Sequence, residues 1–500
     1  MSRLARCVMI QGTASSVGKS VVATALCRVL RDRGWRVAPF KAQNMSLNAA
    51  VTPAGEEIGR AQAAQAEAAG IAPRALMNPI LLKPEGDGRS QVIVLGRVRG
   101  SVAAREYWTT RRELWPAVRD ALRGLRGEFD VVVIEGAGSP AEINLRGSDL
   151  ANMRVARACG ASVVLVADIE RGGVFAQVLG TLDLLRPAER ALVKGVLVNK
   201  FRGDRELFAS GVRALRRRAG VPVLGVLPYA LDLGVPPEDS LSLADAPQEG
   251  ALDVAVVRYP RISNFDDFAP LVAAGARVRY VSAAGALGVP DLLVLPGSKA
   301  TIADLEWLRG CGLGARIRAL ADAGVPILGI CGGFQMLGVE LHDPHGADGA
   351  PARVRGLGLL PARTTFTGAK RTVPVAGTVA SPSAFGAIAG MEVSGYELHL
   401  GVTERDGCPP FADLVRSTTG ERVTDGAVSA DGLVVGTYVH GLFGRSGLRE
   451  ALLGALARRR GIEFAPTALP ADPYAGVARW FAASVDVDGF LAAVGLASRG

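Results

Sequence analysis

The chain has 500 residues, too many for one ordinary hydrophobic core, and its length predicts two or three domains. Charged residues make up 21% and hydrophobic residues 49% of the sequence, which is typical of a globular protein and excludes a disordered or fibrous chain. The formal net charge is +9, but basic residues alternate with acidic ones, so we expect no nucleic-acid partner.

The six cysteines are widely spaced and form no C-x-x-C pair, which favours a reducing compartment over a disulfide framework or a zinc site. The first residues, MSRLARCVMIQG, contain too short an apolar stretch for a signal peptide. No apolar run approaches the length of about 18 residues that a membrane span requires. We therefore expect a cytoplasmic protein without a membrane partner.

Short apolar runs alternate with helical patterns in the first half of the chain. The expected strands are at residues 8–10, 37–38, 131–134, 163–166 and 196–198. Between the first two, residues 19–33 place apolar side chains on one helical stripe, and Gly34 is a stop signal. This alternation predicts an α/β fold, a doubly wound parallel sheet covered by helices.

The pattern lapses near residue 231, where a segment rich in Pro, Asp and Ser has no period. A second alternating series then predicts strands at 254–257, 278–280, 292–295, 327–330 and 434–438. We predict two doubly wound α/β domains at 1–232 and 251–445, joined by a linker at 233–250 and followed by a helical tail at 446–500.

A glycine-rich segment, GTASSVGKS at residues 12–20, lies between the first predicted strand and the first predicted helix. In a phosphate loop, backbone N–H groups cradle the phosphates, Lys19 would neutralise the transferring group and the Ser20 hydroxyl would bind Mg²⁺. The spacing is one residue longer than in the usual motif, so a glycine-rich turn without a phosphate is the alternative. We predict that ATP binds at Gly12, Thr13, Gly18, Lys19 and Ser20.

Polar residues follow other predicted strands at the edge where ligands of open α/β sheets bind. Glu135 and Asp168 end two strands and, with Ser20, are the predicted Mg²⁺ ligands; the alternative for each is an acidic residue in a solvated loop. Lys41 is predicted to meet a phosphate or a substrate carboxylate. Asn199 is predicted to hydrogen-bond the adenine of ATP.

A cysteine stands at a predicted turn from a strand into a helix, in the sequence ILGI-Cys331-Gly332-Gly-Phe. Such a turn exposes a nucleophile, and glycines permit its strained backbone. His440 is the predicted base, and backbone N–H groups near Gly297 and Gly332 are the predicted oxyanion hole for glutamine. The alternative for Cys331 is a small buried hydrophobe. His399 is equally compatible with a structural, a glutamine-site or an interface role.

These motifs carry a resemblance to known enzymes. The N-terminal half resembles ATP-dependent ligases of the dethiobiotin synthetase type, which share the longer phosphate-loop spacing. The C-terminal half resembles class I glutamine amidotransferases, with Gly-x-Cys-Gly-Gly at the nucleophile. Together with PFKAQNMSLN at 39–48, EGAGSPAEINL at 135–145, NKFRGD at 199–204 and GYELH at 395–399, the motifs make residues 5–445 similar to the cobyric acid synthase family.

The resemblance implies a ligase that amidates the b, d, e and g carboxylates of adenosylcobyrinic acid a,c-diamide in cobalamin biosynthesis. It implies ATP and Mg²⁺ as cofactors, a phosphorylated carboxylate, and ammonia released from glutamine through a thioester on Cys331. A synthase of the a,c-diamide itself is an alternative, although that family differs at residues 43–45. A nucleotide-dependent switch with an inert glutaminase-like domain is another, and the sequence leaves a homodimer open.

The sequence departs from related patterns at two places. Most class I glutaminases have a Glu two residues after the histidine, where this chain has Leu442. We therefore predict a Cys–His dyad. Ala14 and Ser15 stand where related phosphate loops often have an acidic residue, so the resemblance provides no further Mg²⁺ ligand.

Overall fold

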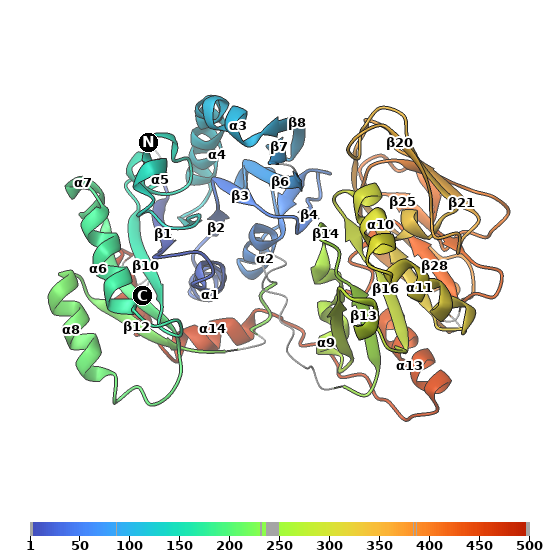
Figure 1. Cartoon of the computed structure of the whole chain (residues 1–500). Coiled ribbons are helices and arrows are strands. Elements are labelled where there is room, and N and C mark those ends of the chain that lie inside the picture. Colours follow the sequence, from blue (N-terminus) through green and yellow to red (C-terminus); the bar gives the residue numbers. More distant parts are fainter. Residues whose placement is uncertain are drawn as a thin grey trace.

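The computed structural model describes residues 4–86, 88–230, 233–236, 250–383, 385–386 and 388–496. These residues form two α/β domains that stand side by side (Figure 1). The predicted fold class is confirmed in both. Most of the predicted linker at 233–250 lies outside the described residues.

The N-terminal domain is built on an all-parallel six-stranded sheet. From edge to edge its strands are β12 (Val223–Pro228), β11 (Val193–Phe201), β10 (Ser162–Asp168), β1 (Arg6–Gly12), β9 (Val131–Glu135) and β2 (Val37–Phe40). The central strands are continuous runs of Val, Ile and Leu because both sheet faces are buried. Since β9 and β10 flank β1, the loop after β1 lies where the strand order reverses, which is the usual ligand position in open sheets.

The helices of this domain cover the faces of this sheet or, like the helix Ala104–Thr110, pack against the insertion that follows β2. They are α1 (Lys19–Asp32), α2 (Arg60–Ala68), α3 (Ala104–Thr110), α4 (Trp115–Glu128), α5 (Met153–Cys159), α6 (Val174–Leu184), α7 (Pro187–Arg190) and α8 (Ala209–Ala219). An insertion after β2 forms a second sheet in the order β3 (Gln43–Met45), β6 (Ile80–Gly86), β7 (Arg89–Val94), β8 (Arg97–Ala103), and a pair β4 (Ala49–Val51), β5 (Glu57–Gly59). This insertion faces the C-terminal domain (Figure 1).

The C-terminal domain has its own six-stranded sheet, parallel except for its last strand. Its order is β15 (Arg277–Val281), β13 (Asp253–Val257), β16 (Leu292–Leu295), β18 (Ile327–Ile330), β28 (Val434–Thr437) and β27 (Ala427–Val428). The helices α9 (Ala269–Ala273), α10 (Thr301–Gly310), α11 (Leu313–Asp322) and α12 (Gly332–Leu337) pack around it. A small pair, β14 (Ile262–Ser263) with β17 (Gly297–Ser298), follows two of its strand ends.

Two further sheets in this domain were not predicted. One is ordered β20 (Ala352–Arg355), β19 (Glu340–Asp343), β21 (Ala362–Thr365), β24 (Val402–Arg405), and the other β26 (Arg422–Asp425), β25 (Ala412–Arg416), β22 (Arg371–Val379), β23 (Glu392–His399), β29 (Val439–His440). Several of these strands, such as ARVR in β20 and VTER in β24, are short and half-exposed. They have no continuous apolar run by which a sequence pattern would identify them.

The predicted helical tail is confirmed, and it connects the two domains. Its first helix, α13 (Ser446–Arg460), packs on the C-terminal domain, but α14 (Ala475–Ala482) and α15 (Val487–Ala493) return to the N-terminal domain. There α14 packs against α1 and covers the same sheet face (Figure 1). Arg28 of α1 also forms an ion pair with Asp472. The tail therefore completes the hydrophobic core of the first domain.

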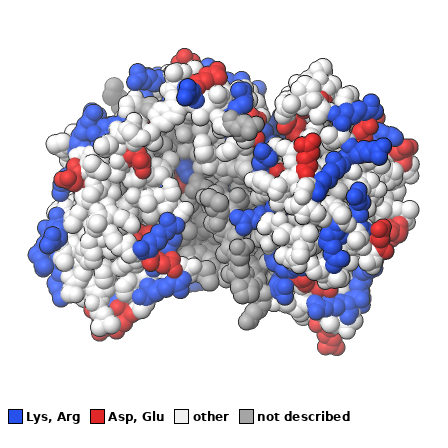
Figure 2. All heavy atoms as spheres, viewed as in Figure 1, with Lys and Arg blue, Asp and Glu red and all other residues white. Residues whose placement is uncertain are grey.

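The described helices include none that is both long enough and apolar enough to cross a membrane. On the face shown in Figure 2, basic and acidic side chains are interspersed over both domains.

Phe481 tests the role of the tail, because its ring is fully buried between α1 and α15 and contacts Phe490 edge-on at 5.7 Å between ring centroids. We expect Phe481→Ala to lower the free energy of unfolding of the N-terminal domain by about 3–5 kcal/mol. The measurement is urea denaturation, with Leu207→Ala as the control, since Leu207 is 82% exposed. Equal denaturation midpoints for the two variants would show that the tail does not stabilise this domain.

Candidate active sites

The segment after β1 has the geometry of a phosphate loop. A side chain at Gly12 would place its Cβ 3.0 Å from the Lys19 amine, and Gly18 has a φ of +98°, which favours glycine. The Lys19 amine donates hydrogen bonds to the carbonyl oxygens of Ala14 and Gly138, each at 3.1 Å. The loop thus holds the Lys19 amine between Ala14 of the loop and Gly138, where a bound phosphate would meet it.

Glu135 is the centre of a buried polar cluster at the end of β9. Its carboxylate accepts a hydrogen bond from the Ser20 hydroxyl at 2.9 Å, forms an ion pair with Lys41 at 2.8 Å, and accepts from the Gln65 amide at 2.6 Å. Ser20 and Glu135, two of the predicted Mg²⁺ ligands, therefore lie together, and a hydroxyl with a carboxylate suits Mg²⁺. Lys41 contacts this carboxylate, so its position supports a role in holding Glu135 as well as one toward a phosphate.

Asp168, the third predicted Mg²⁺ ligand, lies on β10, on the opposite side of β1 from Glu135. It forms an ion pair with Lys200 at 2.9 Å. Within the described ranges no group of three or more His, Cys, Asp or Glu side chains is arranged to hold a metal ion. Of the three predicted ligands, Ser20 and Glu135 are therefore the two that could hold a magnesium ion together.

Two further predicted ATP-binding residues contact the loop or its surroundings. The Asn199 amide donates to the carbonyl oxygen of Val17 at 2.8 Å, so Asn199 supports the loop backbone in this conformation. The Thr13 hydroxyl donates to the Gln177 side chain at 3.3 Å.

Cys331 stands at a strained turn between β18 and α12. Its φ of +54° is rare for a residue with a side chain, and its N–H donates to the carbonyl oxygen of Thr437 at 2.8 Å. A side chain at Gly332 would come within 2.9 Å of the Ser298 nitrogen, and one at Gly297 within 3.2 Å of the His440 ring. The structure therefore brings Cys331, His440 and both predicted oxyanion-hole glycines together.

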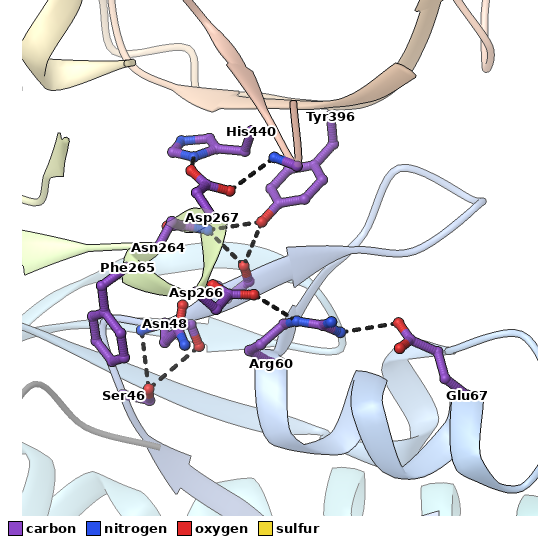
Figure 3. A network of polar contacts seen from close by, with 12 residues as sticks. Ser46, Asn48, Arg60, Glu67, Asn264, Phe265, Asp266, Asp267, Tyr396 and His440 are labelled. Atoms are coloured by element: carbon purple, nitrogen blue, oxygen red, sulfur yellow. Dashed lines mark hydrogen bonds and ion pairs between the residues drawn. The ribbon is translucent and has the colours of Figure 1, made fainter. Parts of the chain in front are cut away.

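A third residue orients the histidine. His440 Nδ1 lies 2.7 Å from a carboxylate oxygen of Asp267, whose other oxygen accepts from the Gly441 N–H at 2.8 Å (Figure 3). Both His440 and Asp267 are buried. The predicted Cys–His dyad is thus incomplete. Asp267, from a distant segment of the chain, provides the orienting carboxylate that the residue two positions after His440, Leu442, cannot provide.

The surroundings of His440 favour its charged form. Burial alone would lower its pKa, but the charge and hydrogen bond of Asp267, with a smaller contribution from Cys331, raise the pKa to about 10. His440 Nε2 makes no hydrogen bond to the described residues, so it remains available on the side of the ring away from Asp267. A protonated imidazole beside Cys331 stabilises a thiolate, the reactive form of cysteine.

The orienting carboxylate is fixed at the contact between the two domains. Asp266, its neighbour in the short helix η5 (Phe265–Phe268), forms an ion pair with Arg60 of α2 at 2.7 Å (Figure 3). Asn264 and Tyr396 both donate to the carbonyl oxygen of Ala49, at 2.6 and 3.0 Å. The N-terminal domain therefore helps to position Asp267 and His440 of the C-terminal domain.

The cavity in front of Cys331 is small and is lined by both domains. Its volume is about 40 Å³, room for a few water molecules, so glutamine binding requires its walls to move. Lys83 and Lys370, from different domains, line it and hold the buried carboxylate of Glu57 at 2.8 and 2.5 Å. Burial opposes ionisation of Glu57, but the two lysine charges hold its pKa at about 2.

His399 also lines this cavity, and its ring stacks on Tyr438 with 3.7 Å between centroids. Burial lowers the pKa of His399 despite the nearby Glu397 carboxylate, so the ring is neutral at neutral pH. Of the roles left open by the sequence, this position favours a place in the wall of the glutamine site.

Comparisons with known proteins agree with the two-domain organisation. Residues 8–242 match the family model of the CobQ/CobB/MinD/ParA nucleotide binding domain, and residues 253–447 match that of the CobB/CobQ-like glutamine amidotransferase domain. A cobyric acid synthase of Sorangium cellulosum is 52% identical, covering 91% of each chain, and one of Moorella thermoacetica is 50% identical, covering 93% of this chain and 91% of the relative. One of Dehalococcoides mccartyi is 48% identical over 92% of both chains.

The chain belongs to the cobyric acid synthase family. It is accordingly a glutamine-dependent, amide-forming ligase with a nucleotide-binding and a glutamine amidotransferase domain.

Asp267→Asn tests the orienting carboxylate. Without that negative charge the pKa of His440 falls, so the imidazolium loses its proton at a lower pH. We expect glutamine-dependent activity to fall by at least about 10-fold and the basic limb of its pH profile to move to lower pH. The measurement is glutamate release as a function of pH.

The control for that variant is Asp413→Asn, which removes an exposed carboxylate from the same domain. Ammonia-dependent amidation should be unchanged in both variants. A basic limb that stays in place in Asp267→Asn would show that Asp267 does not govern the protonation of His440.

Proposed function

We propose that this enzyme amidates the b, d, e and g carboxylates of adenosylcobyrinic acid a,c-diamide, using ATP and glutamine, and so forms cobyric acid in cobalamin biosynthesis. The observation that supports this most directly is the assembly of Cys331, His440 and Asp267 in one chain with a phosphate loop. The relatives named above, at about half identity over nearly the whole chain, favour the same substrate.

Activation of the carboxylate belongs to the N-terminal domain. One carboxylate oxygen of the substrate attacks the γ-phosphorus of ATP, ADP leaves, and an acyl phosphate is formed. Lys19 stabilises the negative charge that develops on the transferring group, while Ser20 and Glu135 would hold a Mg²⁺ ion, which would offset negative charge on the phosphates. The ion pair of Lys41 with Glu135 holds that carboxylate in position.

Ammonia comes from the C-terminal domain. The Cys331 thiolate attacks the side-chain carbonyl carbon of glutamine, and N–H groups near Gly297 and Gly332 stabilise the oxyanion. His440 gives its proton to the departing ammonia, and water then hydrolyses the thioester to glutamate and free thiol. The ammonia attacks the acyl phosphate, inorganic phosphate leaves, and loss of a proton gives the amide.

An a,c-diamide synthase is the second candidate from the ligase class. The sequence at Gln43–Met45 and the names of the relatives favour the later enzyme. Mass spectrometry of the product formed from the a,c-diamide discriminates the two, because four successive amidations are expected here and none from an enzyme that makes only the a,c-diamide. A nucleotide switch with an inert glutaminase-like domain is disfavoured by the assembled Cys331, His440 and Asp267.

Two variants separate the two half-reactions. Cys331→Ala should lower glutamine-dependent amidation by at least about 1,000-fold but leave amidation with ammonium salts intact, because activation belongs to the other domain. Lys19→Ala should lower both by about 100- to 1,000-fold, because it removes transition-state charge stabilisation. The measurements are ADP and glutamate release in the presence of the corrinoid acid.

Loss of the ammonia-dependent reaction in Cys331→Ala would mean that Cys331 has a structural role. Near-normal rates with ammonia in Lys19→Ala would contradict the phosphate-loop assignment. If the wild-type protein releases neither ADP nor glutamate with the corrinoid acid, the proposed function is wrong.

A further inference from the structure

A large cavity lies directly beside the phosphate loop. Its volume is about 1170 Å³, above the range of about 300–1,000 Å³ that is usual for small-molecule sites. Its wall includes Gly138, whose carbonyl oxygen accepts the hydrogen bond from Lys19. A ligand in this cavity would therefore lie next to Lys19, the residue proposed to stabilise the charge on the transferring γ-phosphate.

The cavity is strongly basic. Six arginines line it: Arg111, Arg112, Arg146, Arg154, Arg157 and Arg186. Across the described part of the chain, none of the six forms an ion pair with a carboxylate. This is unusual in a protein whose basic and acidic side chains are otherwise interspersed, and it indicates a site for an anion with several charges.

Two of the three carboxylates in the cavity wall accept hydrogen bonds from backbone N–H groups. Asp149 accepts from the N–H groups of Ala151 and Asn152 at 2.8 and 2.9 Å, and Glu189 accepts from the Arg186 N–H at 3.0 Å. The third, Glu142, is exposed. The acidic residues thus hold the loop and helix ends in place, and within the described residues none of them forms an ion pair with a guanidinium group of the cavity wall.

Arg111 is the decisive residue. It is only 7% exposed, and its Nε and one Nη have no hydrogen-bond partner. A buried guanidinium without a partner costs free energy unless an anion completes the site. Trp108 packs against the guanidinium, 3.7 Å from its ring centroid, which fixes the plane of the guanidinium but satisfies none of its in-plane N–H donors.

We propose that this cavity binds the carboxylate-bearing periphery of the substrate, and that Arg111 pairs with one of its carboxylates while another is presented to the phosphate loop. This assignment rests on the proposed function, because that function supplies a macrocyclic acid with several carboxylates. Ile143, which is 54% exposed on the cavity wall, adds an apolar contact suited to the ring itself. Arg111 is thus a substrate-binding residue.

The test is equilibrium binding to the full-length protein without ATP, so that no turnover occurs. The probes are adenosylcobyrinic acid a,c-diamide and its fully amidated product, followed by the absorbance of the corrin ring. Arg111→Gln should weaken binding of the a,c-diamide by about 10- to 100-fold, since it removes a charge-assisted hydrogen-bonded pair. It should also reduce the preference of the protein for the acid over the amidated product.

The matched control is Arg119→Gln on α4. Arg119 is half-exposed, pairs with its neighbour Asp120 and lies outside the cavity wall, so its loss should leave binding unchanged. ATP binding serves as the check on folding. If Arg111→Gln does not fold, Arg112→Gln with Arg157→Gln replaces it, because both residues are exposed and the double variant should weaken binding of the acid by at least about 10-fold.

The outcomes separate this inference from the function on which it rests. If the wild-type protein binds and amidates the corrinoid acid while the cavity variant binds it as tightly, only the assignment of the cavity is wrong. If the wild-type protein neither binds nor amidates the acid, the proposed function fails and the inference fails with it. Weaker binding confined to the cavity variant supports both.

Discussion

The arrangement of the glutaminase site depends on one run of polar contacts that crosses the domain boundary. It begins at His440, passes to Asp267, and continues through the adjacent Asp266 to Arg60 of the N-terminal domain. Asn264, which directly precedes η5 and has a φ of +52°, donates a hydrogen bond to the carbonyl oxygen of Ala49 in the N-terminal domain. The imidazole therefore has its orientation set by a segment that the other domain holds in place.

This arrangement provides a physical basis for coupling between the two sites. A movement of α2 or of the insertion that contains Ala49 would act on η5, and η5 carries the carboxylate that raises the pKa of His440. The small cavity at Cys331 also supports coupling between the domains. Two residues of its wall, Lys83 and Lys370, come from different domains and both form ion pairs with the fully buried Glu57. Separating those charges has a large electrostatic cost, so opening this wall to glutamine requires a compensating change in the adjoining domain.

The sequence predicted the elements whose residues are close together in the chain. The phosphate loop, the Cys331 turn and the strand-end Glu135 are local patterns, in which a strand, a turn and a helix follow one another. Asp267 could not be found in this way, because it lies 173 residues before His440 and no motif joins them. The one available signal was the absence of Glu after His440, which indicated that an orienting group was missing but not where to look.

The same reasoning explains the other omissions. The tail has the period of ordinary amphipathic helices, and nothing in residues 475–493 indicates that their apolar face belongs to the first domain rather than the second. The cavity arginines come from four separate segments, so that the chain-wide charge looked evenly scattered. Only the fold shows that Arg111 and Arg186 share a wall, and only burial shows that Arg111 lacks a partner.

Under the proposed function, one phosphate loop acts on several carboxylates of the same macrocycle, which imposes a requirement on substrate binding. The loop is fixed by β1 and α1, so each carboxylate must be brought to Lys19 in turn, and the macrocycle must be held in more than one orientation. A rigid binding site that accepted the macrocycle in only one orientation would allow only one of its carboxylates to be amidated. Several arginines spread around a roomy cavity can exchange partners as the ring turns, because each pairs with any carboxylate in reach. Under that function and with the substrate in this cavity, every amide formed would remove one negative charge. Attraction to these arginines would then weaken step by step, and the most fully amidated product would be released most readily.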